Sequence, residues 1–70
     1  MVEVFKTNVQ HRELAEQLAS ILRGWFVFSK ISFDLEDCDK ILRVEGKQIC
    51  VEAIIEILNT HGLQCEVLTD

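Results

Sequence analysis

Hydrophobic residues divide the first third of the chain into a strand and a helix. Residues 1–8 place valine and phenylalanine on both alternating faces, which favours a strand whose second face is partly covered. In residues 10–23, large aliphatic side chains recur at helical spacing with polar residues between them, which predicts an amphipathic helix. Asn8 is the expected N-cap of this helix, and Gly24 is the expected left-handed residue that ends it.

The middle of the chain has the pattern of a β-hairpin. Residues 31–36 alternate hydrophobic and polar side chains, so they are predicted to form a strand with one buried face. Residues 40–45 are predicted to be the returning strand. Between them, Asp37 and Asp39 supply the side-chain acceptors that stabilise tight turns.

The last third repeats the order of helix and strand. Residues 49–61 are predicted to form a second helix that stops at Gly62, and residues 64–68 a final strand. The order strand–helix–strand–strand–helix–strand within 70 residues is the ferredoxin-like βαββαβ arrangement. Because its crossovers are right-handed, both helices are expected on one face of a four-stranded antiparallel sheet. Residues 1–70 are expected to be a single α+β domain.

The run Trp25-Phe26-Val27-Phe28 does not fit the alternation of a strand. Successive side chains of a strand point to opposite faces, so four large hydrophobic residues in a row cannot all face inward. One or two of them are predicted to be exposed or covered by a partner, which would favour self-association. Trp25, Phe26 and Phe28 are therefore the candidate partner-binding residues. The alternative is that this segment wraps under the edge of the sheet.

Composition narrows the classes of partner and the compartment. The formal net charge is −5, and the seven lysines and arginines form no cluster, which disfavours nucleic acid and anionic membranes as partners. No stretch approaches the roughly 20 apolar residues of a membrane helix. The first residues lack the apolar core of a secretory signal, and the three cysteines have no disulfide-framework or CxxC spacing. A cytoplasmic location is therefore expected.

Several segments are similar in sequence to one known family. These are residues 4–9, 33–36 (Phe-Asp-Leu-Glu), 40–45 (Lys-Ile-Leu-Arg-Val-Glu), 54–58 and 61–67. In order, they resemble the first strand, the second strand, the third strand and the closing helix-glycine-strand of the heavy-metal-associated domain family. Members of that family bind copper, zinc or mercury ions in transport ATPases and metallochaperones. The resemblance covers nearly the whole chain and implies the same ferredoxin-like fold.

The chain departs from that family at the metal-binding loop. The family's loop reads Gly-Met-x-Cys-x-x-Cys, and its two thiolates hold a soft ion. In this chain Asn8 stands at the glycine, Val9 at the methionine, His11 at the first cysteine and Leu14 at the second. One imidazole is left as a possible ligand. The leading expectation is therefore a domain that has lost the metal site and carries no cofactor.

Three hypotheses of function follow. The first is a non-catalytic domain that works through protein contacts, made by its sheet face or by residues 25–28. The second is weak copper or zinc binding at His11, with the amino group of Met1 or a partner's residue as a further ligand. The third is a regulatory domain that binds an amino acid or metabolite between two copies. An enzyme is not expected, because the chain has no nucleophile–base arrangement and no phosphate-binding glycine loop.

The remaining histidine and the cysteines are given structural roles. His61, near the end of the second predicted helix, is explained by the preference of the helix dipole for a cation there. Cys38, Cys50 and Cys65 are expected to behave as small hydrophobic residues that are buried or half-buried.

Overall fold

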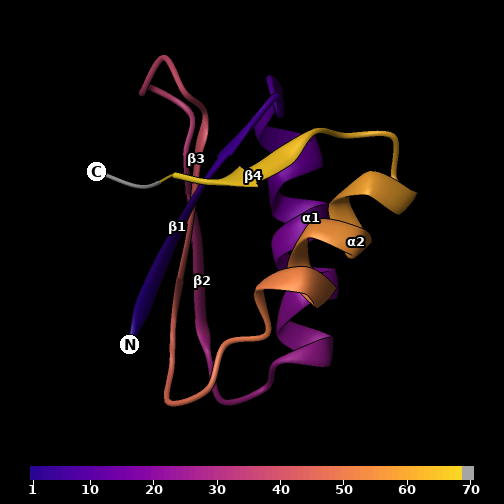
Figure 1. The fold of residues 1–70 in the computed structure, drawn as a ribbon. Coiled ribbons are helices and arrows are strands. Elements are labelled where there is room, and N and C mark those ends of the chain that lie inside the picture. Colours follow the sequence, from indigo (N-terminus) through magenta and orange to yellow (C-terminus); the bar gives the residue numbers. More distant parts are fainter. Residues whose placement is uncertain (69–70) are drawn as a thin grey trace.

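The computed structural model describes residues 1–68 and has the six predicted elements in the predicted order. Thr69 and Asp70, the end of the predicted domain, lie outside the described residues. The elements are β1 (Val2–Thr7), α1 (Arg12–Trp25), β2 (Lys30–Asp34), β3 (Ile41–Glu45), α2 (Val51–Thr60) and β4 (Cys65–Val67) (Figure 1).

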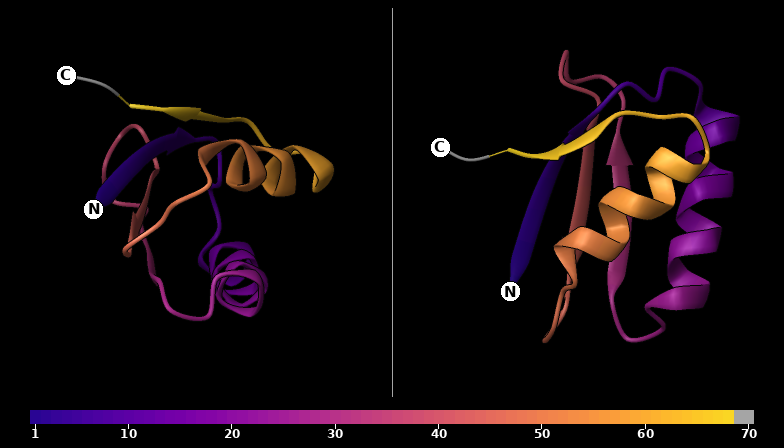
Figure 2. Two further views of the ribbon diagram at one scale, coloured as in Figure 1. Left: turned by 60° about the horizontal axis from the view of Figure 1, so that its bottom comes forward. Right: turned by 45° about the vertical axis from the view of Figure 1, so that its right-hand side comes forward.

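The four strands form one antiparallel sheet in the order β2-β3-β1-β4. Both helices cover the same face of this sheet, and α2 crosses α1 obliquely (Figures 1 and 2). The predicted ferredoxin-like fold is thus confirmed. β4 is short and pairs only with the second half of β1, where Phe5 lies opposite Val67 and Thr7 opposite Cys65. None of the helices within residues 1–68 is long and apolar enough to cross a membrane.

Strand alternation and helical spacing place the core between the sheet and the helices. Phe5 and Leu42 are neighbours on β1 and β3, and both are completely buried on the side of the helices. The helices contribute Leu22, Ile54 and Leu58 to the same layer. A second, smaller cluster lies beneath the loop that joins β1 to α1, and it consists of Val9, Ala15 and Leu18.

The predicted start of α1 was wrong by two residues, and Asn8 is not its N-cap. The helix begins at Arg12, and its N-cap is His11, whose side chain makes no capping hydrogen bond. The side chain of Asn8 instead accepts a hydrogen bond of 2.8 Å from the backbone N–H of Gln64. Asn8 therefore ties the β1–α1 loop to the start of β4, a contact between residues far apart in the sequence.

The two helices end in different ways. The prediction for Gly24 was wrong: α1 continues through Gly24 to Trp25, and Gly24 does not have a positive φ. The prediction for Gly62 is confirmed, since its φ is +79° and its N–H donates a hydrogen bond of 2.9 Å to the carbonyl of Asn59. A left-handed glycine thus ends α2, in agreement with the common C-terminal motif of helices.

Candidate interaction surface

The segment Trp25, Phe26, Val27 and Phe28, here called the aromatic turn, connects α1 to β2. Its backbone is a tight turn, in which the N–H of Ser29 donates a hydrogen bond of 2.9 Å to the carbonyl of Phe26. Since β2 begins only at Lys30, the side chains of this turn do not alternate across the sheet.

Three of the four side chains in the aromatic turn face solvent. Trp25 is 72% exposed, Val27 is 67% exposed and Phe28 is 97% exposed. Phe26 is half-buried and packs against the core. The predicted exposure is therefore confirmed and extends to more residues than expected, whereas Phe26 serves mainly as the anchor of the turn.

Two adjoining hollows extend this apolar surface. The first has a volume of about 720 Å³ and lies between the aromatic turn and the loop that precedes α2. The second has a volume of about 470 Å³ and lies between the two helices. Residues of the first are Trp25, Phe26, Val27, Phe28, Ser29, Lys47 and Gln48. Residues of the second, here called the helix groove, are Ile21, Trp25, Phe26, Ala53, Glu56, Ile57, Thr60 and His61.

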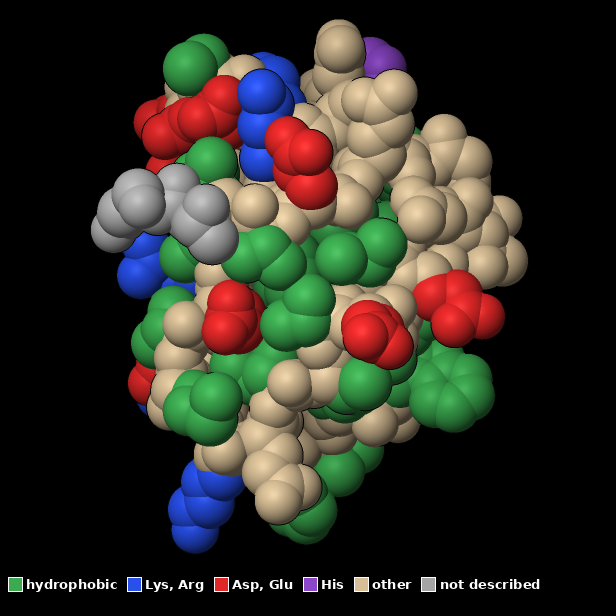
Figure 3. Space-filling model, in the orientation of Figure 1, with side chains coloured by type: hydrophobic (Ala, Val, Ile, Leu, Met, Phe, Trp, Pro, Cys, Tyr) green, Lys and Arg blue, Asp and Glu red, His purple; other side chains and the backbone are tan. Residues whose placement is uncertain are grey.

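Hydrophobic side chains dominate both hollows and reach the molecular surface. Figure 3 shows hydrophobic side chains at the lower end and at the lower right of the molecule. Among residues 1–68, Lys47 is the one charged residue that lines the first hollow, and Glu56 is the carboxylate that lines the helix groove. Trp25 and Phe26 line both, so the two hollows form one continuous surface. Large apolar patches of this kind mark interaction sites more often than ordinary surface.

The opposite face of the sheet has a different character. Side chains that point away from the helices include Lys6 opposite Glu66, and Lys30 opposite Glu45. Each such pair places opposite charges on neighbouring strands, which is typical of a solvated sheet face. This sheet face thus mixes charged side chains with Val2, Val4 and Ile41, whereas the aromatic turn exposes three large hydrophobic side chains in a row of four residues.

The β1–α1 loop holds the predicted metal ligand alone. His11 is exposed, and the one group of three clustered His, Cys, Asp or Glu residues found within residues 1–68 does not include it. The other histidine, His61, is the C-cap of α2, and its Nδ1 lies 2.8 Å from the carbonyl oxygen of Ile57. His61 thus lies at the C-terminal end of α2, where the sequence placed it.

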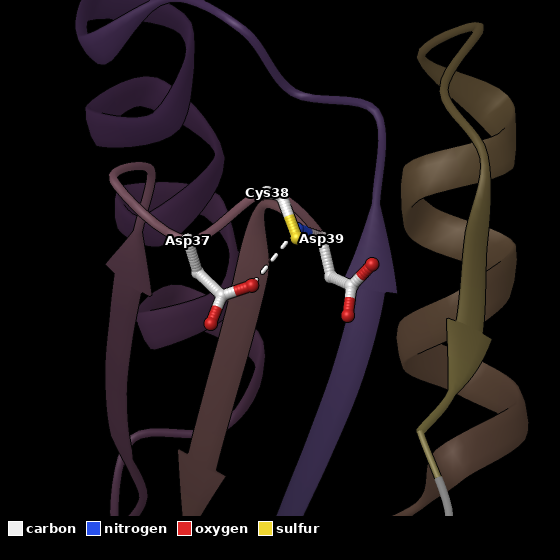
Figure 4. Close-up of side chains that lie close together, drawn as sticks. All are labelled: Asp37, Cys38 and Asp39. Atoms are coloured by element: carbon white, nitrogen blue, oxygen red, sulfur yellow. Dashed lines mark hydrogen bonds between the residues drawn. The ribbon is translucent and has the colours of Figure 1, made fainter.

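The clustered group lies in the β2–β3 hairpin and consists of Asp37, Cys38 and Asp39 (Figure 4). The backbone N–H of Asp39 donates a hydrogen bond of 2.8 Å to the Asp37 carboxylate, as expected of an Asx turn. A second hydrogen bond, of 3.0 Å, joins the N–H of Lys40 to the carbonyl of Asp37, and Lys40 has a left-handed φ of 49°. The three side chains are therefore close together because they belong to one tight turn.

The cysteines are less buried than predicted. Cys38 and Cys50 are exposed, because one lies in the hairpin turn and the other is the N-cap of α2. Only Cys65 is half-buried as expected, within β4. Burial and the neighbouring Glu66 carboxylate raise the pKa of the Cys65 thiol from its ordinary value of 9.0 to about 11. A thiol with a raised pKa is a poor nucleophile near neutral pH.

No family model matches the chain, and no curated protein and no solved structure matches it significantly. The resemblance to heavy-metal-associated domains therefore stays a prediction.

Proposed function

We propose that this chain is a small, non-catalytic interaction domain that binds another protein chain through the aromatic turn and the helix groove. The observation that carries the proposal is the almost complete exposure of Phe28, at 97%, beside Trp25 and Val27. Aromatic residues at the centre of an interface supply most of its binding energy in many complexes.

Binding of a partner to the aromatic turn would be favourable because it removes apolar surface from water. An aromatic side chain buries roughly 150–250 Å². At about 25 cal/mol per Å², covering one such ring contributes roughly 4–6 kcal/mol before the costs of association. A fold of 70 residues buries a smaller fraction of its surface than a large domain does, so its stability margin is thin. A partner that covers these hydrophobic side chains would therefore add to the stability of the fold.

The ionisable groups also support a binding role rather than catalysis. The other residues that line the hollow of Cys65 are polar, and the Cys65 thiol, with a pKa raised to about 11, is protonated at neutral pH. In the hairpin, the Asp37 carboxylate accepts the turn hydrogen bond from Asp39, and the Asp39 carboxylate lies 3.8 Å from the amino group of Lys6. The carboxylates beside Cys38 lie in an exposed hairpin turn rather than in an enclosed pocket, which is a poor setting for covalent catalysis.

The test is affinity capture from cells of the source organism with three forms of the chain. Phe28→Ser removes the most exposed ring, and Leu68→Ser is the matched control, because Leu68 is an exposed hydrophobic residue outside this surface. The expected result is a partner that is retained by the wild type and by Leu68→Ser but lost from Phe28→Ser. An identical set of captured proteins from all three forms would contradict the proposal.

A further inference from the structure

The interaction surface carries both a projection and a hollow that could receive it. Phe28 and Val27 project from the aromatic turn, since they are 97% and 67% exposed. The helix groove, about 470 Å³ in volume, opens on the other side of Trp25. Pockets that hold drug-sized ligands have volumes of roughly 300–1,000 Å³, so the groove has room for an aromatic ring.

From this pairing we infer that the partner is a second copy of the chain, bound as a two-fold symmetric dimer in which Phe28 of each copy enters the helix groove of the other. This inference rests on the proposed function, because it assigns the partner of the same surface. A two-fold contact uses one patch on both copies, so the patch must contain both the projection and its receptor. Trp25 lines both hollows and would lie near the symmetry axis.

The charges at the two ends of the surface are complementary in this arrangement. Lys47 lines the hollow beside Phe28, and Glu56 lines the helix groove. When Phe28 of one copy enters the groove of the other, its neighbour Lys47 approaches Glu56 of that other copy, and the contact repeats by symmetry. Opposite charges across an interface fix its register and favour encounter. They also offset the repulsion between two chains that each carry a formal charge of −5.

The area is also close to what a stable dimer needs. The exposed parts of Phe28, Val27 and Trp25 amount to roughly 350–500 Å², and the groove wall covered by the partner's side chains adds a similar or smaller area. Each copy would then bury roughly 600–800 Å², compared with about 800 Å² per partner in a standard interface. A peptide or a lone side chain in the groove would leave Phe28 itself exposed.

Analytical ultracentrifugation of the purified chain, from about 1 μM to about 1 mM, measures the association directly. The wild type and Leu68→Ser are expected to reach twice the 8.1 kDa monomer mass. Phe28→Ser is expected to weaken association by roughly tenfold or more. Because Phe28 is exposed, this variant should keep the circular dichroism spectrum and unfolding midpoint of the wild type.

A charge exchange identifies the partner as a copy of the same chain. Lys47→Glu and Glu56→Lys each place like charges opposite one another and should weaken the dimer by roughly threefold to tenfold at low salt. The double variant Lys47→Glu/Glu56→Lys restores the opposite pairing and should recover most of the wild-type association.

Three results would overturn the dimer. They are a wild-type chain that stays monomeric at about 1 mM, a dimer that is unaffected by Phe28→Ser, and a double charge variant no better than the singles. Insertion of a monomeric wild-type chain into vesicles of mixed zwitterionic and anionic phospholipid through Phe28 would also overturn it. If the chain is monomeric but Phe28→Ser still loses a captured partner, the proposed function stands and only the dimer fails. If Phe28→Ser behaves as wild type in both experiments, both fail.

Discussion

Gly46 and Ser29 lie in such close contact that a Cβ atom on Gly46 would be 2.6 Å from the Oγ of Ser29 and 3.3 Å from its Cβ. Gly46 follows β3, and Ser29 precedes β2, so this contact brings the loop before α2 against the aromatic turn. It thereby places Lys47 beside Phe28 in the same hollow. The geometry of the proposed interface depends on the absence of a side chain at residue 46.

Gly46→Ala is therefore expected to destabilise the fold by about 1 kcal/mol, because the new methyl group must displace Ser29. Ser29→Gly removes both atoms of the close contact, so Gly46→Ala should cost less in that background. Urea denaturation of the wild type, both single variants and the double variant measures the coupling, which should be about 0.5–1 kcal/mol. If the changes in the free energy of unfolding caused by the two substitutions were strictly additive, the contact between residues 29 and 46 would not limit how closely the two loops approach.

The six elements and their order could be predicted from the sequence because hydrophobic period is a local property. Alternation in residues 31–36 and helical spacing in residues 10–23 both reported the buried face correctly. The start of α1 could not be predicted in the same way. The β1–α1 loop is held by contacts of Asn8 with Gln64 and of Thr7 with Lys40, which lie 56 and 33 positions away.

The candidate surface was likewise only half predictable. Exposure in the aromatic turn was predicted from the alternation of a strand. The segment is instead the end of α1 followed by a turn, so the exposure was predicted correctly but for a different physical reason. The helix groove depends on how α2 crosses α1, and no local pattern reports a crossing angle. The position of Lys47 beside Phe28 depends on strand pairing and on Gly46, which are also tertiary features.

Thr7 provides a test of the contacts that hold the β1–α1 loop. Its hydroxyl donates a hydrogen bond of 2.6 Å to the carbonyl of Lys40 and accepts one of 3.2 Å from the N–H of Val9. Thr7→Val keeps the shape but leaves these groups unpaired at a position that is only 6% exposed, so it should cost about 1–3 kcal/mol. Thr7→Ser keeps the hydroxyl and should cost less. Equal unfolding midpoints in urea for the two variants would argue against the hydrogen bonds as the cause.

The two glycines at the helix ends are expected to respond to alanine in opposite directions. A Cβ would meet no atom within 4 Å at Gly24 or at Gly62, so backbone conformation alone decides the effect. Gly62→Ala should destabilise by about 1 kcal/mol because φ is +79°. Gly24→Ala, inside α1, should stabilise by about 0.5 kcal/mol. Thermal unfolding of both variants measures the sign of each change in stability. A stabilising Gly62→Ala would contradict the left-handed conformation of Gly62.

The metal hypothesis for His11 is tested by adding Cu(I) and Zn(II) to the reduced protein and following the backbone amides by NMR. We expect no saturable shift confined to residues 9–14 at stoichiometric metal, because a single exposed imidazole forms a weak site. Shifts near the exposed Cys38 or Cys50 would report binding to a thiol instead. A saturable shift in residues 9–14 that disappears in His11→Ala would establish a metal site and replace this expectation.

Cys65 should make stability depend on alkaline pH. Its thiol has a pKa of about 11 in the folded chain, compared with an ordinary value of 9.0, because burial and the Glu66 carboxylate disfavour the thiolate. Below pH 9 the thiol is protonated in both states, so its contribution to stability is complete. Between pH 9 and 11 the unfolded chain loses the proton first, and stability should therefore fall as the pH rises.

The control for this pH dependence is Cys65→Ala, which removes the thiol and leaves every other ionisable group in place. The free energy of unfolding, measured in urea at several values of pH, should fall less steeply above pH 9 for this variant than for the wild type. The same burial predicts that, at pH 8, a thiol-alkylating reagent modifies Cys38 and Cys50 before Cys65. Parallel pH profiles, together with alkylation of Cys65 as fast as the exposed thiols, would show that Cys65 is not shielded in the folded chain.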